Sequence, residues 1–330
     1  MSSRLVFSLL AVSSLAHAEL PIPMIGRQSH NEGIRAVPAK GPVEIDGNLT
    51  EWDLSGKIWS FADVAIRDRY SVETSVMWDK ENLYIGQFVR DPNPLVNTID
   101  PTFDPKSGWK GDALQLRVLT DWPSWVTFWQ HSPSRKSAMH LASWTDAENS
   151  KDTEDTLLIG EPDSKDLGQG VQMASKPVEN GYIREIRIPW KVIYKNTPEI
   201  AAGLKIRLGL ELFWGRPGES TWPSHRYTDN LQKGETSREF FWTAKRAWGD
   251  VTLLPEGNVE PLRYTLPGQK LEGTVPLKLE IPADAKEFTV VIETKDGKRI
   301  RNLGAQLDPE LYQISTKDGK RTVEVLWDGA

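Results

Sequence analysis

The chain has 330 residues and a formal net charge of −6, so it lacks the basic excess that a nucleic-acid partner would require. It contains no cysteine, which excludes disulfides, thiolate metal sites and cysteine nucleophiles. Its 14 tryptophans, 25 glycines and 22 prolines accompany no long helical pattern. The composition therefore favours a β-rich protein with many turns.

The N-terminus has the pattern of a secretory signal peptide. Arg4 gives a short positive region, an apolar stretch follows, and Ala16-His17-Ala18 forms an A-x-A cleavage site. The apolar stretch is too short to span a bilayer, and no later segment is apolar enough to be a membrane anchor. We therefore predict a signal peptide over residues 1–18, cleavage near Ala18, and a secreted, periplasmic or envelope location.

Strand patterns predominate over residues 41–255. An extended lead-in is expected over residues 19–40 because it is poor in large apolar residues, and a first strand at 42–47. Residues 72–87 alternate on both sides of a turn at 79–82 and predict a hairpin. Residues 145–170 are polar and acidic and predict an irregular excursion. Further strands are expected at 113–118, 121–130, 180–190, 204–214 and 247–255.

The composition changes after Pro255. Residues 256–275 are rich in glycine and proline and are predicted to be a linker. A small β unit is expected over residues 276–330. The peptide "KDGKR" occurs in it twice, at 295–299 and 317–321, and each copy predicts a turn beside a strand.

Five stretches occur in this order: "VEIDGNLTEWD", "VMWDKENLYIGQFVRDP", "GWKGDALQLRV", "NGYIREIRIPW" and "WTAKRAWGDVTLLP". Taken together, they resemble the family 9 carbohydrate-binding modules of the DOMON-like group. They cover residues 41–255, so the resemblance implies an all-β, antiparallel β-sandwich of immunoglobulin-like or DOMON-like type. In the small C-terminal unit, "VVIETKDGKRIRNL" and "LWDGA" resemble parts of an immunoglobulin-like domain of the flagellar-hook-capping type. The resemblance implies that this domain is shortened, and we expect a further domain beyond Ala330.

The resemblance implies a ligand site for a mono-, oligo- or polysaccharide. Trp109 and Trp242 fall where the family places two tryptophans that sandwich a sugar ring. Gln115 stands where the family has a glutamate that bonds sugar hydroxyls, and an amide keeps the ability to donate and accept. Arg216 falls near a further sugar-contacting arginine, whereas the arginine expected on the next strand is not evident. The alternative for each tryptophan is packing in the core, which we expect for Trp52, Trp78, Trp190 and Trp214.

Family members also bind calcium, which needs six to eight oxygen ligands. Asp91 and Asp112, with Asp100 and Asp104 in the same region, are the expected donors for a structural calcium ion. The competing interpretation is that Asp91 and Asp104, each before a proline, are turn residues.

Two other functions stay open at this point. Some DOMON-like relatives hold b-type haem, for which Met77, Met139 or Met173 could pair with His131 or His140. The chain could also be a non-catalytic docking module of the envelope. No serine elbow, metal triad or phosphate loop is present, and nothing singles out a carboxyl pair for hydrolysis. We therefore expect the protein to contribute binding, alongside a polysaccharide-degrading or envelope system, and not catalysis.

Overall fold

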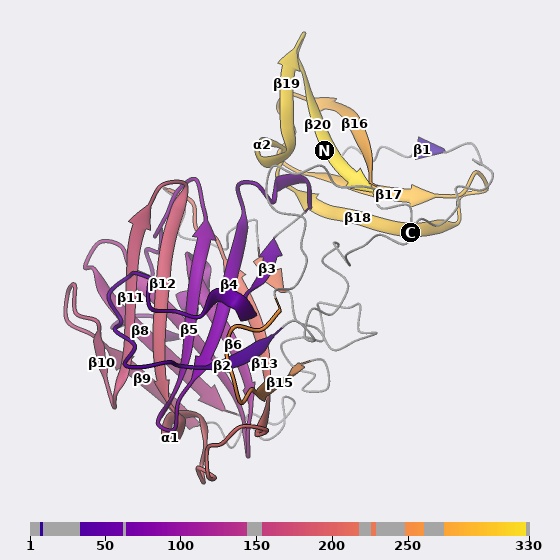
Figure 1. The fold of residues 1–330 in the computed structure, drawn as a ribbon. Coiled ribbons are helices and arrows are strands. Elements are labelled where there is room, and N and C mark those ends of the chain that lie inside the picture. The colour runs from indigo at the N-terminus through magenta and orange to yellow at the C-terminus, as the bar shows by residue number, and fades with distance from the viewer. Residues whose placement is uncertain are drawn as a thin grey trace. The chain divides into compact units, whose positions relative to one another are not determined.

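The chain is almost entirely β, as predicted (Figure 1). The computed structural model describes residues 7–8, 34–61, 64–143, 154–217, 226–228, 248–260 and 274–327. These residues form two compact units. The larger unit contains the described residues of 25–63 and 67–264, and the smaller unit contains those of 265–330 with 7–8 and 64–66. No helix in these ranges has the length and apolarity needed to cross a membrane.

Hydrogen bonds join the strands of the larger unit in one continuous order, β10-β11-β12-β5-β4-β2-β15-β13-β6-β7-β8-β9, with β3 paired to β4 and β14 to β13. Its strands are β2 (Arg35–Pro38), β3 (Ile58–Phe61), β4 (Ser71–Trp78), β5 (Asn82–Arg90), β6 (Ala113–Leu119), β7 (Pro123–His131), β8 (Lys136–Ser143), β9 (Glu154–Ile159), β10 (Asp166–Gly168), β11 (Val171–Val178), β12 (Gly181–Pro189), β13 (Lys205–Phe213), β14 (Arg226–Thr228) and β15 (Gly249–Leu253). The short helices are η2 (Leu54–Gly56), η4 (Pro105–Lys110) and α1 (Trp190–Ile193).

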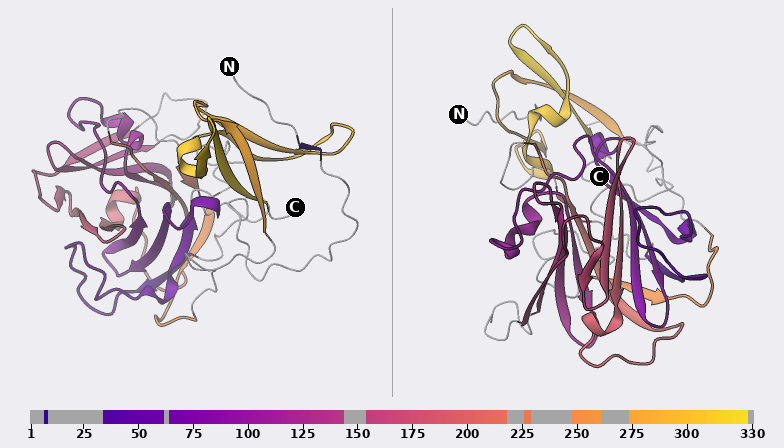
Figure 2. Two further views of the ribbon diagram at one scale, coloured as in Figure 1. Left: turned by 90° about the horizontal axis from the view of Figure 1, so that it is seen from above. Right: turned by 90° about the vertical axis from the view of Figure 1, so that its left-hand side faces the viewer.

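This order folds into two layers, seen edge-on in Figure 2. The first layer runs from β10 to β4, and the second runs from β15 to β9. Strand β2 joins them because it pairs in parallel with β4 on one side and with β15 on the other. Period-2 alternation turns one apolar set from each layer inward, where it is buried. The inward residues include Leu83, Ile85, Val89, Ile186, Ile188, Leu114, Leu116, Val118, Leu208, Leu210 and Leu212.

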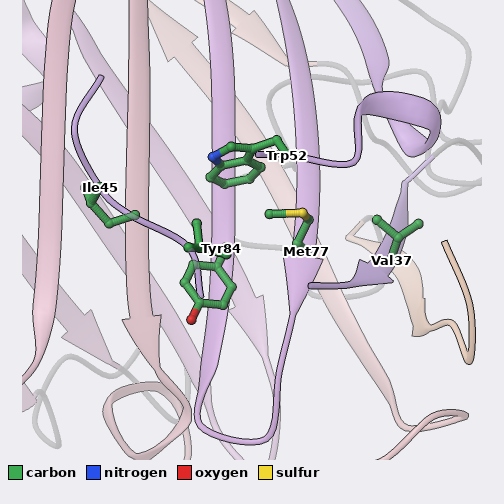
Figure 3. Close-up of a cluster of buried hydrophobic side chains, with 6 residues drawn as sticks. Val37, Ile45, Trp52, Met77 and Tyr84 are labelled. Atoms are coloured by element: carbon green, nitrogen blue, oxygen red, sulfur yellow. The ribbon is translucent and has the colours of Figure 1, made fainter. Parts of the chain in front are cut away.

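A second apolar cluster covers the outer face of the first layer (Figure 3). Trp52 stands edge-on to Tyr84 of β5, with ring centroids 6.4 Å apart and an interplanar angle of 87°. Met77 of β4 lies beside them, and Ile45 comes from the segment that crosses this face. The indole has room because the strand carries Gly86, where a Cβ atom would lie 2.8 Å from the Trp52 ring.

Two predicted element positions are wrong. Residues 42–47 form no strand, and the first strand of the larger unit is instead β2, inside the predicted lead-in. The apolar residues of 42–47 are buried by packing on the outer face, which gives the same alternation without strand pairing. Part of the predicted excursion is also regular, because β9 adds to β8 as an antiparallel strand and β10 pairs with β11. Polar edge strands show little apolar alternation, which is why the pattern missed them.

The hairpin at β4–β5 and the strands β6, β7, β12, β13 and β15 are confirmed. The turn before β12 has Asn180 at a φ of 64°, a conformation that asparagine tolerates better than most residues.

The smaller unit consists of two three-stranded sheets. Both copies of the repeated peptide lie at antiparallel hairpin turns, with Gly297 and Gly319 at positive φ, as predicted. Phe288 packs edge-on against Tyr312, with centroids 5.5 Å apart. Its elements are β16 (Val275–Pro282), β17 (Phe288–Glu293), β18 (Arg299–Leu307), α2 (Pro309–Tyr312), β19 (Gln313–Lys317) and β20 (Lys320–Trp327), with β1 (Phe7–Ser8) parallel to β17 and η3 (Val64–Ile66) in the same unit. The immunoglobulin-like description stays a prediction.

Candidate functional site

The candidate site lies on the outer face of the second layer. In this layer Glu211 of β13, Gln115 of β6 and Thr127 of β7 are register partners, so their side chains form one row on the same face. His140 of β8 continues the row. A row of polar side chains across four strands is unusual on a face that is largely buried, and it identifies this face as a place for specific hydrogen bonding.

A hydrogen-bonded chain fixes the Gln115 amide. Arg117 Nη2 donates to Gln115 Oε1 at 2.9 Å and to Glu211 Oε2 at 2.9 Å. Gln115 Nε2 donates to Thr127 Oγ1 at 2.9 Å. A flipped amide would set its NH₂ against the guanidinium, so the orientation is determined by Arg117. Gln115 is half-buried and keeps one N–H and further oxygen lone-pair capacity for a ligand.

Trp109 lies at the edge of this face, in η4. It is half-buried and packs on Phe213 of β13, with ring centroids 6.2 Å apart and an interplanar angle of 54°. The backbone beneath it is held close to the sheet because Gly108 lies on the Trp129 indole, where a Cβ atom would approach to 2.6 Å. The Lys110 ammonium is 5.6 Å from the Trp109 centroid. Trp109 therefore sits at the mouth of β6 as a partly accessible aromatic side chain.

Of the other two predicted ligand residues, the structure describes Arg216 but not Trp242. Arg216 follows Gly215, whose N–H donates to Asp112 Oδ1 at 2.6 Å, so the end of β13 is tied to the start of β6 only three residues after Trp109. Trp242 lies outside the described residues, and its convergence with Trp109 stays a prediction.

A second polar group lies on the same face. The Asp155 carboxylate contacts Lys106 Nζ at 2.8 Å and His140 Nε2 at 3.3 Å. Burial lowers the pKa of His140 against the opposing effect of Asp155. For Asp155, burial is outweighed by its bonds with Lys106 and His140, so its pKa is lowered. This group holds β9 and η4 against β8.

The tryptophans expected in the core are there, since Trp52, Trp78, Trp190 and Trp214 are all buried. Trp125 and Trp129 are also buried, and Trp125 packs edge-on against Trp248, with centroids 5.3 Å apart. Trp122 is half-buried and donates to the Ile193 carbonyl at 3.1 Å. Packing therefore accounts for most of the described tryptophans, and Trp109 differs from the core set in its exposure.

Asp91 and Asp112 meet inside the sandwich. Asp91 Oδ1 accepts the Asn93 N–H at 2.8 Å in a turn, as the alternative interpretation predicted. Asp112 Oδ1 accepts from Gly215 and Oδ2 accepts the Val96 N–H at 2.8 Å. Burial raises the pKa of Asp91 to about 6. Burial and the Asp91 carboxylate together hold the pKa of Asp112 well above its usual value.

These residues do not fit a calcium ion. Calcium takes six to eight oxygens, but within the described ranges no three acidic or histidine side chains come together in a cluster that could hold a metal. Both Asp112 oxygens already accept backbone N–H groups. Asp100 is engaged in its own turn, accepting from the Thr102 N–H and hydroxyl.

The haem alternative lacks a shared face for its ligands. Met139 and His140 are neighbours on β8 and therefore point to opposite faces. Met77 lies under Trp52 on the outer face of the first layer, where its sulfur accepts the Asp53 N–H at 3.3 Å. His131 is on the second layer and contacts Ser134 Oγ at 2.7 Å. Met173 of β11 is the register partner of the inward-facing Ile186 and also points into the sandwich. None of the three methionines therefore shares a face with His131 or His140.

Two residues of the site were missed from the sequence. Arg117 supplies a guanidinium on the same strand as Gln115, two residues on, and Glu211 balances its charge at 2.9 Å. The alternation of β6 already placed Arg117 on the face of Gln115. The family resemblance implied an arginine on the next strand and therefore did not point to Arg117.

Comparisons with known proteins identify the family of the chain. A family model described as carbohydrate family 9 binding domain-like matches residues 55–254, more than half of the chain. Endo-1,4-beta-xylanase A of Thermotoga neapolitana is 23% identical over 220 residues, and that of Thermotoga maritima is 24% identical. Each match covers 61% of this chain and 18% of the relative, so the chain spans about a fifth of the length of these curated relatives.

A solved family 9 module from Caldicellulosiruptor kristjanssonii, in complex with cellotriose, is similar with a TM-score of 0.42 and 14% identity, covering 70% of this chain and all of that one. A second structure of such a module from the same organism, with glucose, gives a TM-score of 0.40 and 13% identity, covering 68% of this chain and 98% of that one. From the family match, the chain belongs to the carbohydrate family 9 binding domain-like family.

Proposed function

We propose that the larger unit binds a mono-, oligo- or polysaccharide on the outer face of the second layer, beside Trp109. The observation that carries the proposal is the Gln115 amide, fixed by Arg117 and Thr127 on the same face as a half-buried indole. A sugar presents an apolar face of C–H groups, which packs on an aromatic ring, and a rim of hydroxyls. A ligand site of this kind combines apolar walls with a few placed polar groups.

The charge arrangement suits a hydroxyl-bearing ligand. The Arg117–Glu211 pair is buried, with side chains 4% and 5% exposed, so its two charges compensate each other inside the face. Gln115 then presents donor and acceptor capacity without a net charge of its own. Sugar hydroxyls both donate and accept, so one oriented amide can satisfy two of them.

The remaining parts of the proposed site are predictions from the family. Trp242 would form the second wall of the slot and Arg216 would add donors at its rim. We expect a complex of modest affinity, since a micromolar Kd corresponds to only about 8 kcal/mol.

The test is a glycan array on the whole chain, followed by titration of the best ligand. Trp109→Ala should weaken binding by about 2 kcal/mol, roughly thirtyfold, because a stacked aromatic anchor carries much of such an interface. Trp122→Ala is the matched control, because Trp122 is also half-buried but lies at the Thr120–Pro123 turn. An unchanged Kd for Trp109→Ala, with the fold retained by circular dichroism, rejects the site.

We also propose that the protein works outside the cytoplasm. Residues 1–18 would be removed on export, and the module would bring a polysaccharide-degrading or envelope system to its substrate. Mass spectrometry of the exported product should give an N-terminus near Glu19. A full-length product retained in the cytoplasm would contradict export and leave the sugar site untouched.

A further inference from the structure

Arg184 is a charged residue in the interior of the sandwich. It lies on β12 between Tyr182 and Ile186 on the inward face, and none of it is exposed. Its Nε–H donates to Ser175 Oγ at 3.4 Å, and the guanidinium carbon is 5.1 Å from the Tyr182 ring centroid. A fully buried arginine is rare unless another group compensates its charge.

The groups around Arg184 leave polar atoms without direct partners. Among the described residues, Arg184 Nη1 and Nη2, the Tyr182 hydroxyl and Gln87 Oε1 make no hydrogen bond, whereas the Asp91 carboxyl group is hydrogen-bonded to that of Asp112. Gln87 is the register partner of Arg184 on β5, and Asp91 extends the same inward row just after that strand. The set combines several donors with acceptors, which is the composition that ordered buried water satisfies.

Arg184 is also the cation that faces the carboxyl pair. It interacts electrostatically with both Asp91 and Asp112, although neither forms a direct ion pair with it. Asp112 comes from the second layer, where Gly215 and Val96 hold its two oxygens. The Arg184 guanidinium and the carboxyl groups of Asp91 and Asp112 therefore face one another across the interior but form no direct ion pair.

We propose that Arg184 is a fixed counter-ion for Asp91 and Asp112, acting through ordered water, so that this carboxyl pair needs no metal ion to balance its charge. A divalent cation added here would be repelled by the guanidinium and would lack the oxygen ligands it needs. We therefore expect that the stability of the folded module does not depend on a calcium ion at this carboxyl pair.

The first test is thermal unfolding of the whole chain in EDTA and in millimolar calcium chloride. Wild type should change its Tm by less than about 1 °C, because a ligand that does not bind the native state adds no stability. Terbium(III) should give no emission sensitised by tyrosine or tryptophan above the level of Asp91→Asn. A calcium-dependent rise of several degrees that vanishes in Asp91→Asn, but survives in the exposed control Asp121→Asn, overturns the proposal.

The second test is a double-mutant cycle between Arg184 and Asp91. Arg184→Met should lower Tm markedly, because it leaves the carboxyl pair without its counter-ion, and adding Asp91→Asn should restore part of the loss. Strictly additive effects would show that Arg184 does not serve the pair. If Arg184→Met alone does not fold, Arg184→Lys keeps the charge and should fold, whereas equal failure of both variants contradicts a counter-ion role.

Discussion

Glu185 of β12 and Trp52 are hydrogen-bonded across 133 residues of sequence, from the indole Nε1 to the Glu185 Oε1 carboxylate oxygen at 2.7 Å. The other oxygen accepts backbone N–H groups from the turn before Trp52, including Asp46 at 2.8 Å and Asn48 at 3.0 Å. One buried side chain thus holds the segment that crosses the outer face of the first layer. This explains why a strand with an inward apolar face also carries a glutamate on its other side.

Glu185→Ala should lower the free energy of unfolding by about 3 kcal/mol or more, because each buried donor left without an acceptor costs roughly 1–3 kcal/mol. Glu185→Gln should lose less, since its amide oxygen still accepts. Urea unfolding measures both. Glu179→Ala, at an exposed position in the preceding turn, is the control and should be close to wild type. Equal midpoints for Glu185→Ala and Glu179→Ala would refute the anchoring role.

The hydrogen bond between Trp52 and Glu185 could not be predicted from the sequence, although both residues stood out in it. Trp52 and Glu185 each stand in a stretch that predicted the family, yet period-2 alternation says only which face a residue occupies. Alternation was enough to place Gln115 beside Arg117 and to bury Leu114. It could not show that Arg184 on an inward position keeps its charge inside the sandwich, because that depends on groups from the facing layer. Nor could it reveal β2, whose pairing partners lie at distant places in the chain.

Gly86 should not tolerate a side chain. A Cβ atom there would lie 2.8 Å from the Trp52 ring and 2.9 Å from Leu49 Cδ2, so either the indole or the strand must move. Gly86→Ala should cost about 1–3 kcal/mol of folding stability, as overpacking of a tight core does. Near-ultraviolet circular dichroism should report the displaced indole. Gly41→Ala is the matched control because no atom lies within 4 Å of its Cβ position. A Gly86→Ala protein as stable as Gly41→Ala would contradict the packing.

Asp53 should make the larger unit sensitive to acid. Burial opposes its ionisation, but bonds from the Ser55 hydroxyl, from the backbone of Asn258 and Ser55, and from Lys40 outweigh it and lower the pKa of Asp53 to about 2, from 3.8. Because the folded pKa is lower, the unfolded chain binds more protons between about pH 4 and pH 2. The stabilisation is therefore complete above about pH 4 and is lost as the pH falls through the folded pKa. The loss is roughly 2 kcal/mol.

Urea unfolding at a series of pH values checks this. The stability gap between wild type and Asp53→Asn should be widest above about pH 4 and should narrow toward pH 2. A gap of constant size over that range would show that the contribution of Asp53 does not depend on its charge.

Gln115 should control affinity more than stability. Its amide bonds Arg117 and Thr127, but Arg117 keeps Glu211 when the amide is removed. Gln115→Ala should therefore weaken sugar binding roughly tenfold, the value of about one hydrogen bond of 1.4 kcal/mol, with a smaller change in unfolding free energy. Gln115→Glu should bind more tightly than wild type, because a charge-assisted bond is roughly twice as strong as a neutral one. Isothermal titration with the best array ligand measures both. Gln172→Ala, on β11 of the other layer, controls for the loss of an amide. If Gln115→Ala binds like the Gln172 control, the row of Glu211, Gln115 and Thr127 serves the sheet alone and the ligand lies elsewhere.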